Sequence, residues 1–326
     1  MAGRTWSVVA LLAAGVAAGT TTTAQAQDRT PQGSQRNRPP LRSSDQAPEK
    51  PATAPERYDP RVGYAWRKGD KQRNLTSVKA THLITFMRGG KPVHVENKTS
   101  GFELRYVDEM AQLGPGGRGV VRIERTYERV KDWATGREER RPRTVTLDFS
   151  QPHVKVIRDE QELDPIVSDL LEDTEKRDQR DFAHLFPTKP VVEIGEEWEI
   201  PPQAVTRLWL LDEEHLNAEG SRCTGRLAAR RTVKGVEQVK LVLELTLQMR
   251  KLWGDELQFD PPAEMAWTLE IWGAARGEHP EEEATMQGSL EGVAKLVGKD
   301  VPPDVKVQVR TTCQGTFKSN LVAASR

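Results

Sequence analysis

Residues 241–249 read Leu-Val-Leu-Glu-Leu-Thr-Leu-Gln-Met, and this stretch decides the fold. From Leu241 to Met249 every second residue is apolar, whereas Glu244, Thr246 and Gln248 stand between them. A period of two places successive side chains on opposite faces of a β-strand, so that one face is buried and the other meets water. This pattern is typical of an antiparallel sheet.

The same alternation returns on both sides of this stretch. The residues that share one face in these other segments are His82, Ile84, Phe86, Phe102, Leu104, Tyr106, Val145, Leu147, Phe149, Trp267, Leu269, Ile271, Val305, Val307 and Val309. Strands are therefore predicted in two blocks, one before and one after the middle of the chain.

Between the two blocks the apolar period changes to that of a helix. One amphipathic stripe is formed by Leu163, Ile166, Val167, Leu170 and Leu171. Asp164 followed by Pro165 predicts an N-cap and a first helical residue. A second helical stretch, predicted after Pro201-Pro202, carries Val205, Leu208, Trp209 and Leu211.

Helices inserted into a meandering sheet must bury their apolar stripes, and the nearest apolar surface is the inner face of that sheet. We therefore expect a mainly β (α+β) fold, a curved antiparallel sheet or open barrel of about 11 strands with two or more helices inserted mid-chain. Two smaller sheet domains joined through the helical region are the alternative.

The N-terminal residues predict export. Arg4 gives a positive start, Trp6 to Ala18 form an apolar run, and Ala24-Gln25-Ala26 is a cleavage site of the A-x-A type. We expect a signal peptide over 1–26, a disordered Pro/Gln/Ser/Arg-rich linker over 27–57 and a β-rich globular domain over 58–326. The predicted location is periplasmic or extracellular, and the cleaved product is not expected to be an integral membrane protein.

Charge argues against a nucleic-acid partner. The 48 Lys and Arg residues are balanced by 48 Asp and Glu residues. Binding to nucleic acid depends on clustered positive charge, and the predicted domain has no such excess.

The two cysteines, Cys223 and Cys313, both lie in the predicted exported domain. Because oxidation is allowed outside the cytoplasm, we expect a disulfide between them. Two buried free thiols on separate strands are the alternative.

No motif in the sequence brings a recognised catalytic or metal-binding arrangement. Residues 114–119 read Gly-Pro-Gly-Gly-Arg-Gly, but a strand pattern follows where a dinucleotide site needs a helix, so a hairpin loop is predicted. The histidines beside carboxylates at 212–215 and 279–283 lack zinc-site spacing, and neither C-x-x-C nor G-x-S-x-G occurs. We expect no metal and no cofactor.

The most distinctive segment is 186–200, in which Pro190, Gly195 and Trp198 form a P-V-x-x-x-G-x-x-W core. This core resembles a short motif found in uncharacterised secreted and envelope β-rich proteins of bacteria. The resemblance implies no catalytic residues. From the residues themselves we expect a structural turn: Pro190 fixes its φ, Gly195 permits a left-handed conformation, and Trp198 restarts the period of two.

The order of strands, helices and strands also resembles the periplasmic lipoprotein-carrier fold, an open barrel with a helical lid. We therefore expect a non-enzymatic envelope protein that holds a lipid or another apolar or amphipathic ligand between sheet and lid. The residues expected to line that site are Trp209, Leu241, Leu243, Leu245, Trp267, Leu269 and Ile271. Two alternatives stay open: a structural or interaction module that pairs with another envelope protein, and a periplasmic hydrolase.

Overall fold

The computed structural model describes residues 57–59, 65–115, 119–158, 163–176, 184–189, 191–208, 213–252, 257–275, 281–297 and 305–322. The predicted signal peptide, all of the predicted linker except Arg57, and two predicted site residues, Pro190 and Trp209, lie outside these ranges.

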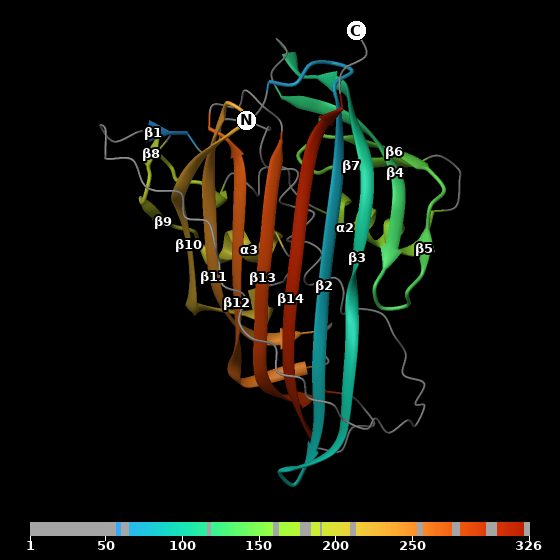
Figure 1. Ribbon diagram of the computed structural model, residues 1–326. Coiled ribbons are helices and arrows are strands. Elements are labelled where there is room, and N and C mark those ends of the chain that lie inside the picture. Colours follow the sequence, from blue (N-terminus) through green and yellow to red (C-terminus); the bar gives the residue numbers. More distant parts are fainter. Residues whose placement is uncertain are drawn as a thin grey trace.

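One large antiparallel sheet of 12 strands dominates the described part of the chain (Figure 1). Its strands run in the order β7-β6-β4-β3-β2-β14-β13-β12-β11-β10-β9, and β5 pairs with β4. Their bounds are β2 Lys71–Arg88, β3 Lys91–Leu113, β4 Val120–Asp132, β5 Glu138–Glu139, β6 Arg143–Asp148, β7 Lys155–Arg158, β9 Glu197–Glu199, β10 Leu216–Val233, β11 Val236–Leu252, β12 Leu257–Ala274, β13 Glu282–Leu296 and β14 Val305–Val322. A separate two-stranded sheet pairs β1 (Arg57–Tyr58) with β8 (Val192–Glu193).

The two blocks of strands form a single sheet, because β14 pairs with β2 along its whole length, from Val305 opposite Arg88 to Val322 opposite Lys71. The alternative of two separate sheet domains is therefore wrong. Among the described strands the sheet is not closed, and β7 and β9 are its two edges. The predicted open antiparallel sheet is confirmed.

Two short helices lie on the inner side of the sheet, around which the strands curve (Figure 1). Helix α2 (Pro165–Glu175) contacts β4 and β7, whereas α3 (Pro202–Leu208) contacts β10. The predicted start of α2 is confirmed, since the Asp164 carboxylate accepts a hydrogen bond of 3.0 Å from the Ile166 N–H. A 3-10 turn, η3 (Glu213–His215), leads into β10.

The glycine-rich connection from β3 to β4 is a hairpin, as the sequence predicts. The Gly114 N–H donates to the Gly119 carbonyl at 3.0 Å, and the strand β4 follows directly. A dinucleotide site would need a helix at this point. Residues 116–118 lie outside the described ranges.

The predicted disulfide is wrong: Cys223 and Cys313 are buried free thiols. Cys223 lies on β10 and Cys313 on β14, and the strands β11, β12 and β13 separate them in the sheet. Strands are spaced about 4.8 Å apart, so the two cysteines are roughly 19 Å apart along the sheet. A disulfide needs Cα atoms within about 7 Å. The prediction failed because consecutive strands pair with one another, which puts β10 and β14 at a distance.

Candidate functional site

The six predicted ligand-lining residues that the structure describes lie together on the inner face of the sheet. They form three directly opposed pairs between β11 and β12, namely Leu241 with Ile271, Leu243 with Leu269 and Leu245 with Trp267. All six are buried and belong to one apolar cluster that extends across the sheet. The seventh, Trp209, lies outside the described residues.

The row of residues through Trp267 crosses most of the inner face. From β10 to β2 its members are Cys223, Leu245, Trp267, Gly288, Cys313 and Ala80. The indole of Trp267 lies over Gly288, since a Cβ built on Gly288 would come within 2.3 Å of Trp267 Cε3. The ring thus extends over the neighbouring strand, and only a glycine leaves room for it there.

Side chains of the helices join the same apolar cluster. Val167 and Leu171 of α2, and Ala204 and Val205 of α3, are buried within it. Because α2 contacts β4 and β7 while α3 contacts β10, the two helices cover opposite sides of the inner face. The sequence predicted helices packed on this face, and the structure confirms that packing.

A polar group that the sequence analysis did not single out interrupts the inner face. His82 on β2 is buried, with its Nε2 atom 2.7 Å from Ser100 Oγ and its Nδ1 atom 3.0 Å from Thr311 Oγ1. Burial, and secondly the charge of Lys98, lower the pKa of His82 below its ordinary value of 6.5. The neutral imidazole is therefore favoured at neutral pH. The sequence did indicate that His82 lies on the inner face, because it has the same alternation phase as Ile84 and Phe86.

A buried ion pair also faces inward, between β3 and β4. Arg125 donates two hydrogen bonds to the Asp108 carboxylate, at 2.7 and 2.8 Å, and its guanidinium lies 4.1 Å from the centre of the Tyr106 ring. Burial lowers the pKa of Arg125, but the charge and hydrogen bonds of Asp108, together with Tyr106 and Tyr127, outweigh it and leave that pKa well above the usual value. Burial raises the pKa of Tyr106 to about 12. Nothing in the spacing of these residues predicted the pair, because a bulge shifts the β3–β4 register.

Gly195 lies at a turn, and Trp198 packs at the edge of the sheet. Gly195 has a φ of 89°, and the Glu196 N–H donates to the Glu193 carbonyl at 3.0 Å. Trp198 lies on β9, where its Nε1–H donates to the Leu185 carbonyl at 2.9 Å and its ring packs over Gly225. This tryptophan anchors an edge strand and packs at the edge of the inner face, in the row that continues through Gly225 to Leu243.

The described residues form neither a metal site nor a reactive cysteine site. No group of three or more His, Cys, Asp and Glu side chains among them could hold a metal ion. Burial raises the pKa of both Cys223 and Cys313 to about 12, so these thiols are protonated and poor nucleophiles at neutral pH. None of the described helices has both the length and the apolar character needed to cross a membrane.

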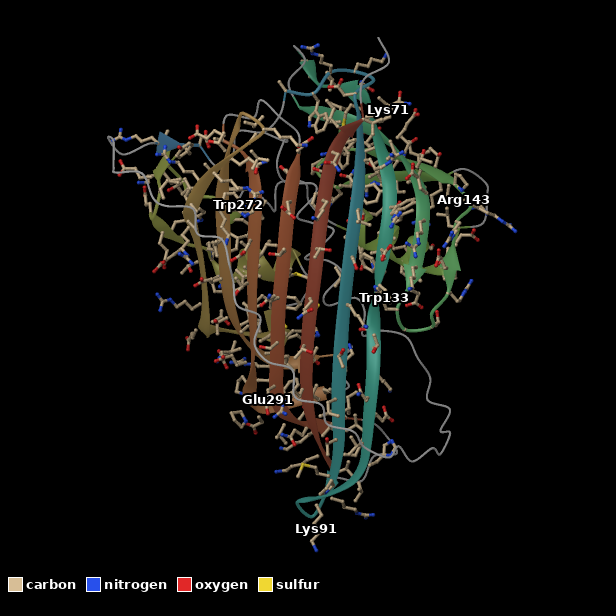
Figure 2. All side chains as sticks on the ribbon, viewed as in Figure 1. Lys71, Lys91, Trp133, Arg143, Trp272 and Glu291 are labelled. Carbon is tan, nitrogen blue, oxygen red and sulfur yellow. The ribbon has the colours of Figure 1, made fainter. Side chains whose placement is uncertain are left out.

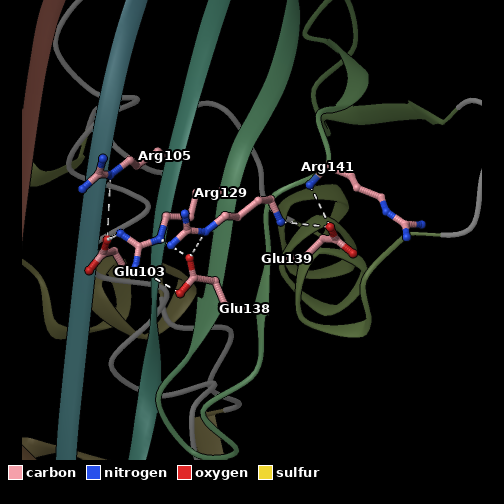
Figure 3. A network of polar contacts seen from close by, with 7 residues as sticks. Glu103, Arg105, Arg129, Glu138, Glu139 and Arg141 are labelled. Atoms are coloured by element: carbon pink, nitrogen blue, oxygen red, sulfur yellow. Dashed lines mark hydrogen bonds and ion pairs between the residues drawn. The ribbon is translucent and has the colours of Figure 1, made fainter.

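The outer face of the sheet is charged where the inner face is apolar. Around β3, β4 and β5 the Arg129 guanidinium bridges two carboxylates, Glu103 at 2.7 Å and Glu138 at 3.0 Å (Figure 3). The side chains of Arg129, Glu103 and Glu138 are 22%, 17% and 25% exposed, so the charged groups of this face remain partly in contact with water.

Comparisons with known proteins name no family for this chain. No family model matches, and no curated protein matches. Among solved structures, a Salmonella typhi OmpF complex with daunomycin is similar at 7% identity, covering 78% of this chain and 99% of that one. Its TM-score is 0.19, which is too low to support a conclusion about the fold or the function of this chain.

Proposed function

We propose that this chain is an exported, non-enzymatic envelope protein that binds the apolar part of a lipid or another amphipathic ligand between the inner face of its sheet and the helices. The observation that carries the proposal is the open sheet with a continuous apolar inner face. The opposed pairs of β11 and β12 lie on that face, toward its β9 edge, and helices cover its two sides.

The polar residues on the same face favour an amphipathic ligand over a purely apolar one. His82, Ser100 and Thr311 offer ring nitrogens and hydroxyl groups within an apolar surface. A bound headgroup or ester could exchange hydrogen bonds with them, and apolar chains would extend toward Trp267 and Leu245. Ligand sites commonly combine an apolar lining with a few placed polar groups in this way.

Native mass spectrometry of the exported protein, gently extracted from its own host, tests whether a ligand is bound. We expect a mass above that of the mature chain and a lipid-like molecule released on denaturation. A protein that emerges without any bound small molecule, and that also fails to bind a fluorescent fatty acid, would overturn the proposal.

A pair of neighbouring variants locates the ligand on one face. Phe86 is partly buried against the apolar cluster of the inner face, and Met87 is the next residue on the same strand and points to the outer face. Phe86→Lys is expected to weaken binding of a fluorescent fatty acid at least tenfold, because it places a charge at the rim of the apolar surface. Met87→Lys is the matched control and should bind as the wild type does.

A second candidate, a hydrolase, is favoured by one contact. The 2.7 Å approach of His82 Nε2 to Ser100 Oγ is the distance expected between a general base and a serine nucleophile. The third member here is the Thr311 hydroxyl in place of the carboxylate of a Ser-His-Asp triad. A fluorophosphonate probe separates the two functions: labelling of the wild type that Ser100→Ala abolishes would replace the carrier by a hydrolase.

A further inference from the structure

The end of the sheet that holds the β2–β3 turn, Gly89–Gly90, differs from the rest of the outer face. Five of its apolar side chains are exposed, namely Leu83, Val93, Val95, Val293 and Val297. Val93 and Val95 are 60% and 55% exposed, the two largest values among the exposed apolar residues of the described chain. Water-exposed apolar residues gathered at one place mark an interaction site more often than scattered ones do.

The register brings these residues onto one surface. Val95 lies opposite Thr85, Thr85 opposite Gln308, and Gln308 opposite Val293, so that the row crosses β3, β2, β14 and β13. Leu83 precedes this row by one step on β2, and Val297 follows it near the end of β13. We call these five apolar residues and the basic residues beside them the basic-apolar surface.

Positive charge surrounds the apolar residues. The basic members are all exposed. Lys295 and Lys306 lie opposite each other on the outer face, whereas Arg88 and Lys91 flank the β2–β3 turn at the tip of the sheet, with Arg88 opposite Val305. Lys91 lies at the tip of the sheet (Figure 2). Within 82–99, 291–297 and 305–311 the acidic residues are Glu96 and Glu291. Each of these is paired with a cation, Glu96 with Lys98 at 2.6 Å and Glu291 with Arg310 at 2.6 Å.

The surface has a clear boundary on its β12 side. There Asp260 and Glu264 are exposed, and Glu264 lies opposite Glu291 in the register. The positive excess is therefore confined to β13, β14, β2 and β3. An apolar surface ringed by cations is complementary to lipid headgroups of negative charge above an apolar interior.

We propose that the basic-apolar surface binds the surface of an anionic lipid bilayer. The exposed valines and Leu83 enter the headgroup region, and the lysines and Arg88 contact lipid phosphates. The proposal concerns the outer face at one end of the sheet together with the β2–β3 turn at its tip, and it does not require a ligand on the inner face. If a lipid does occupy the inner face, the two sites lie on opposite faces of the same strands.

Sedimentation with vesicles of defined composition tests the proposal. The mature chain is expected to bind vesicles of phosphatidylcholine and phosphatidylglycerol at 7:3, and to bind pure phosphatidylcholine vesicles at least tenfold more weakly. Raising the ionic strength should weaken the binding further, because exposed charges are screened. Equal binding to both vesicles would overturn the proposal, as would binding to neither.

Variants at the two ends of the sheet provide a matched comparison. Lys91→Glu with Lys306→Glu is expected to reduce binding at least tenfold, and Val93→Ser with Val95→Ser should reduce it several-fold. The control is Val233→Ser with Lys234→Glu, at the exposed β10–β11 turn of the opposite end. An equal loss in the control would overturn the proposal.

Two further measurements keep the outcomes distinct. All substituted residues are exposed, so thermal unfolding followed by circular dichroism should match the wild type. Binding of a fluorescent fatty acid should also be unchanged, which separates this surface from the inner-face site. Binding to soluble heparin without binding to anionic vesicles would assign the surface to an anionic polymer and overturn the bilayer proposal.

Discussion

The two halves of the inner face are both buried, but they bury different types of residue. On β10 to β13 the buried side chains of this face are leucine, isoleucine, valine, methionine, cysteine, alanine, phenylalanine and tryptophan, such as Leu243 and Leu269, which lie opposite each other. On β2 to β4 the same face also holds His82, Asn74 and the ion pair of Asp108 with Arg125. We call these the aliphatic half and the polar half.

This difference indicates which interaction stabilises each half. The aliphatic half is stabilised by removing apolar surface from water, an effect roughly proportional to area. The polar half depends on the pairing of its charged groups, because a buried charge without its partner carries a large desolvation penalty. Loss of one partner should therefore cost more in the polar half than loss of one apolar side chain costs in the aliphatic half.

Asp108→Ala should have the largest effect. It leaves the Arg125 guanidinium, whose side chain is 15% exposed, without its bidentate partner. Removing one member of a buried pair typically lowers the free energy of unfolding by about 3–5 kcal/mol. Urea unfolding followed by circular dichroism measures the change.

The control for Asp108 is its neighbour on the outer face. Glu109 pairs with Lys71 at 2.9 Å, and both side chains are more than a third exposed. Glu109→Ala should change the free energy of unfolding by less than about 1 kcal/mol. If the two variants were equally destabilised, the Asp108 pair would not be the buried, obligatory contact described here.

Leu243→Ala comes next and tests the aliphatic half. Leu243 is 1% exposed and lies between Gly225 and Leu269 in the register. Truncating a buried leucine leaves a cavity and costs about 2–5 kcal/mol. Glu244→Ala, on the wet face of the same strand, should cost less than about 0.5 kcal/mol. A cost for Leu243→Ala as small as that would indicate a loosely packed inner face.

The aliphatic half was the part of the site that the sequence could predict. Strict alternation from Leu241 to Met249 and from Trp267 to Ile271 specifies which side chains share a face, and directly opposed strands then bring them together. The helix start at Asp164 and the turn at Gly195 were also predictable, because each depends on neighbouring residues only. These are local properties.

The pairing of Asp108 with Arg125 and the separation of the two cysteines could not be predicted, because both depend on strand order and register. Arg125 meets Asp108 only after a shift of register between β3 and β4. Cys223 and Cys313 share a face and a row, but three strands lie between them. Alternation assigns a residue to a face and leaves its cross-strand neighbours undetermined.

Gly288→Ala should have a moderate effect, and it probes the tryptophan of the aliphatic half. An added Cβ would lie 2.3 Å from Trp267 Cε3, so the indole must move within a packed surface. Such overpacking costs about 1–3 kcal/mol. Near-ultraviolet circular dichroism should report the displaced ring, and Ser289→Ala on the outer face is the control.

Gly225→Ala sharpens that result, because Trp198 lies over Gly225 just as Trp267 lies over Gly288. Trp198 belongs to β9, an edge strand of three residues whose one partner among the described strands is β10. An edge strand can shift more easily than a central one, so Gly225→Ala should destabilise the protein less than Gly288→Ala. The reverse order would mean that the β9 edge is held as rigidly as the centre of the sheet.

The smallest effect is expected for His82→Gln, and it appears only as a dependence on pH. Because burial lowers the pKa of native His82 below 6.5, the unfolded chain takes up a proton at a pH where the native chain does not. The native state therefore keeps the His82 contribution above about pH 6.5 and loses it as the pH falls through the lowered native pKa. His82→Gln removes this proton uptake while a side-chain amide can still reach Ser100 or Thr311. Urea unfolding is measured at pH 7.5 and at pH 5.5. Between these two values the wild type should lose more unfolding free energy than the variant. Equal losses would mean that His82 is hydrated or charged in the native state, and that the polar half is open to water at this point.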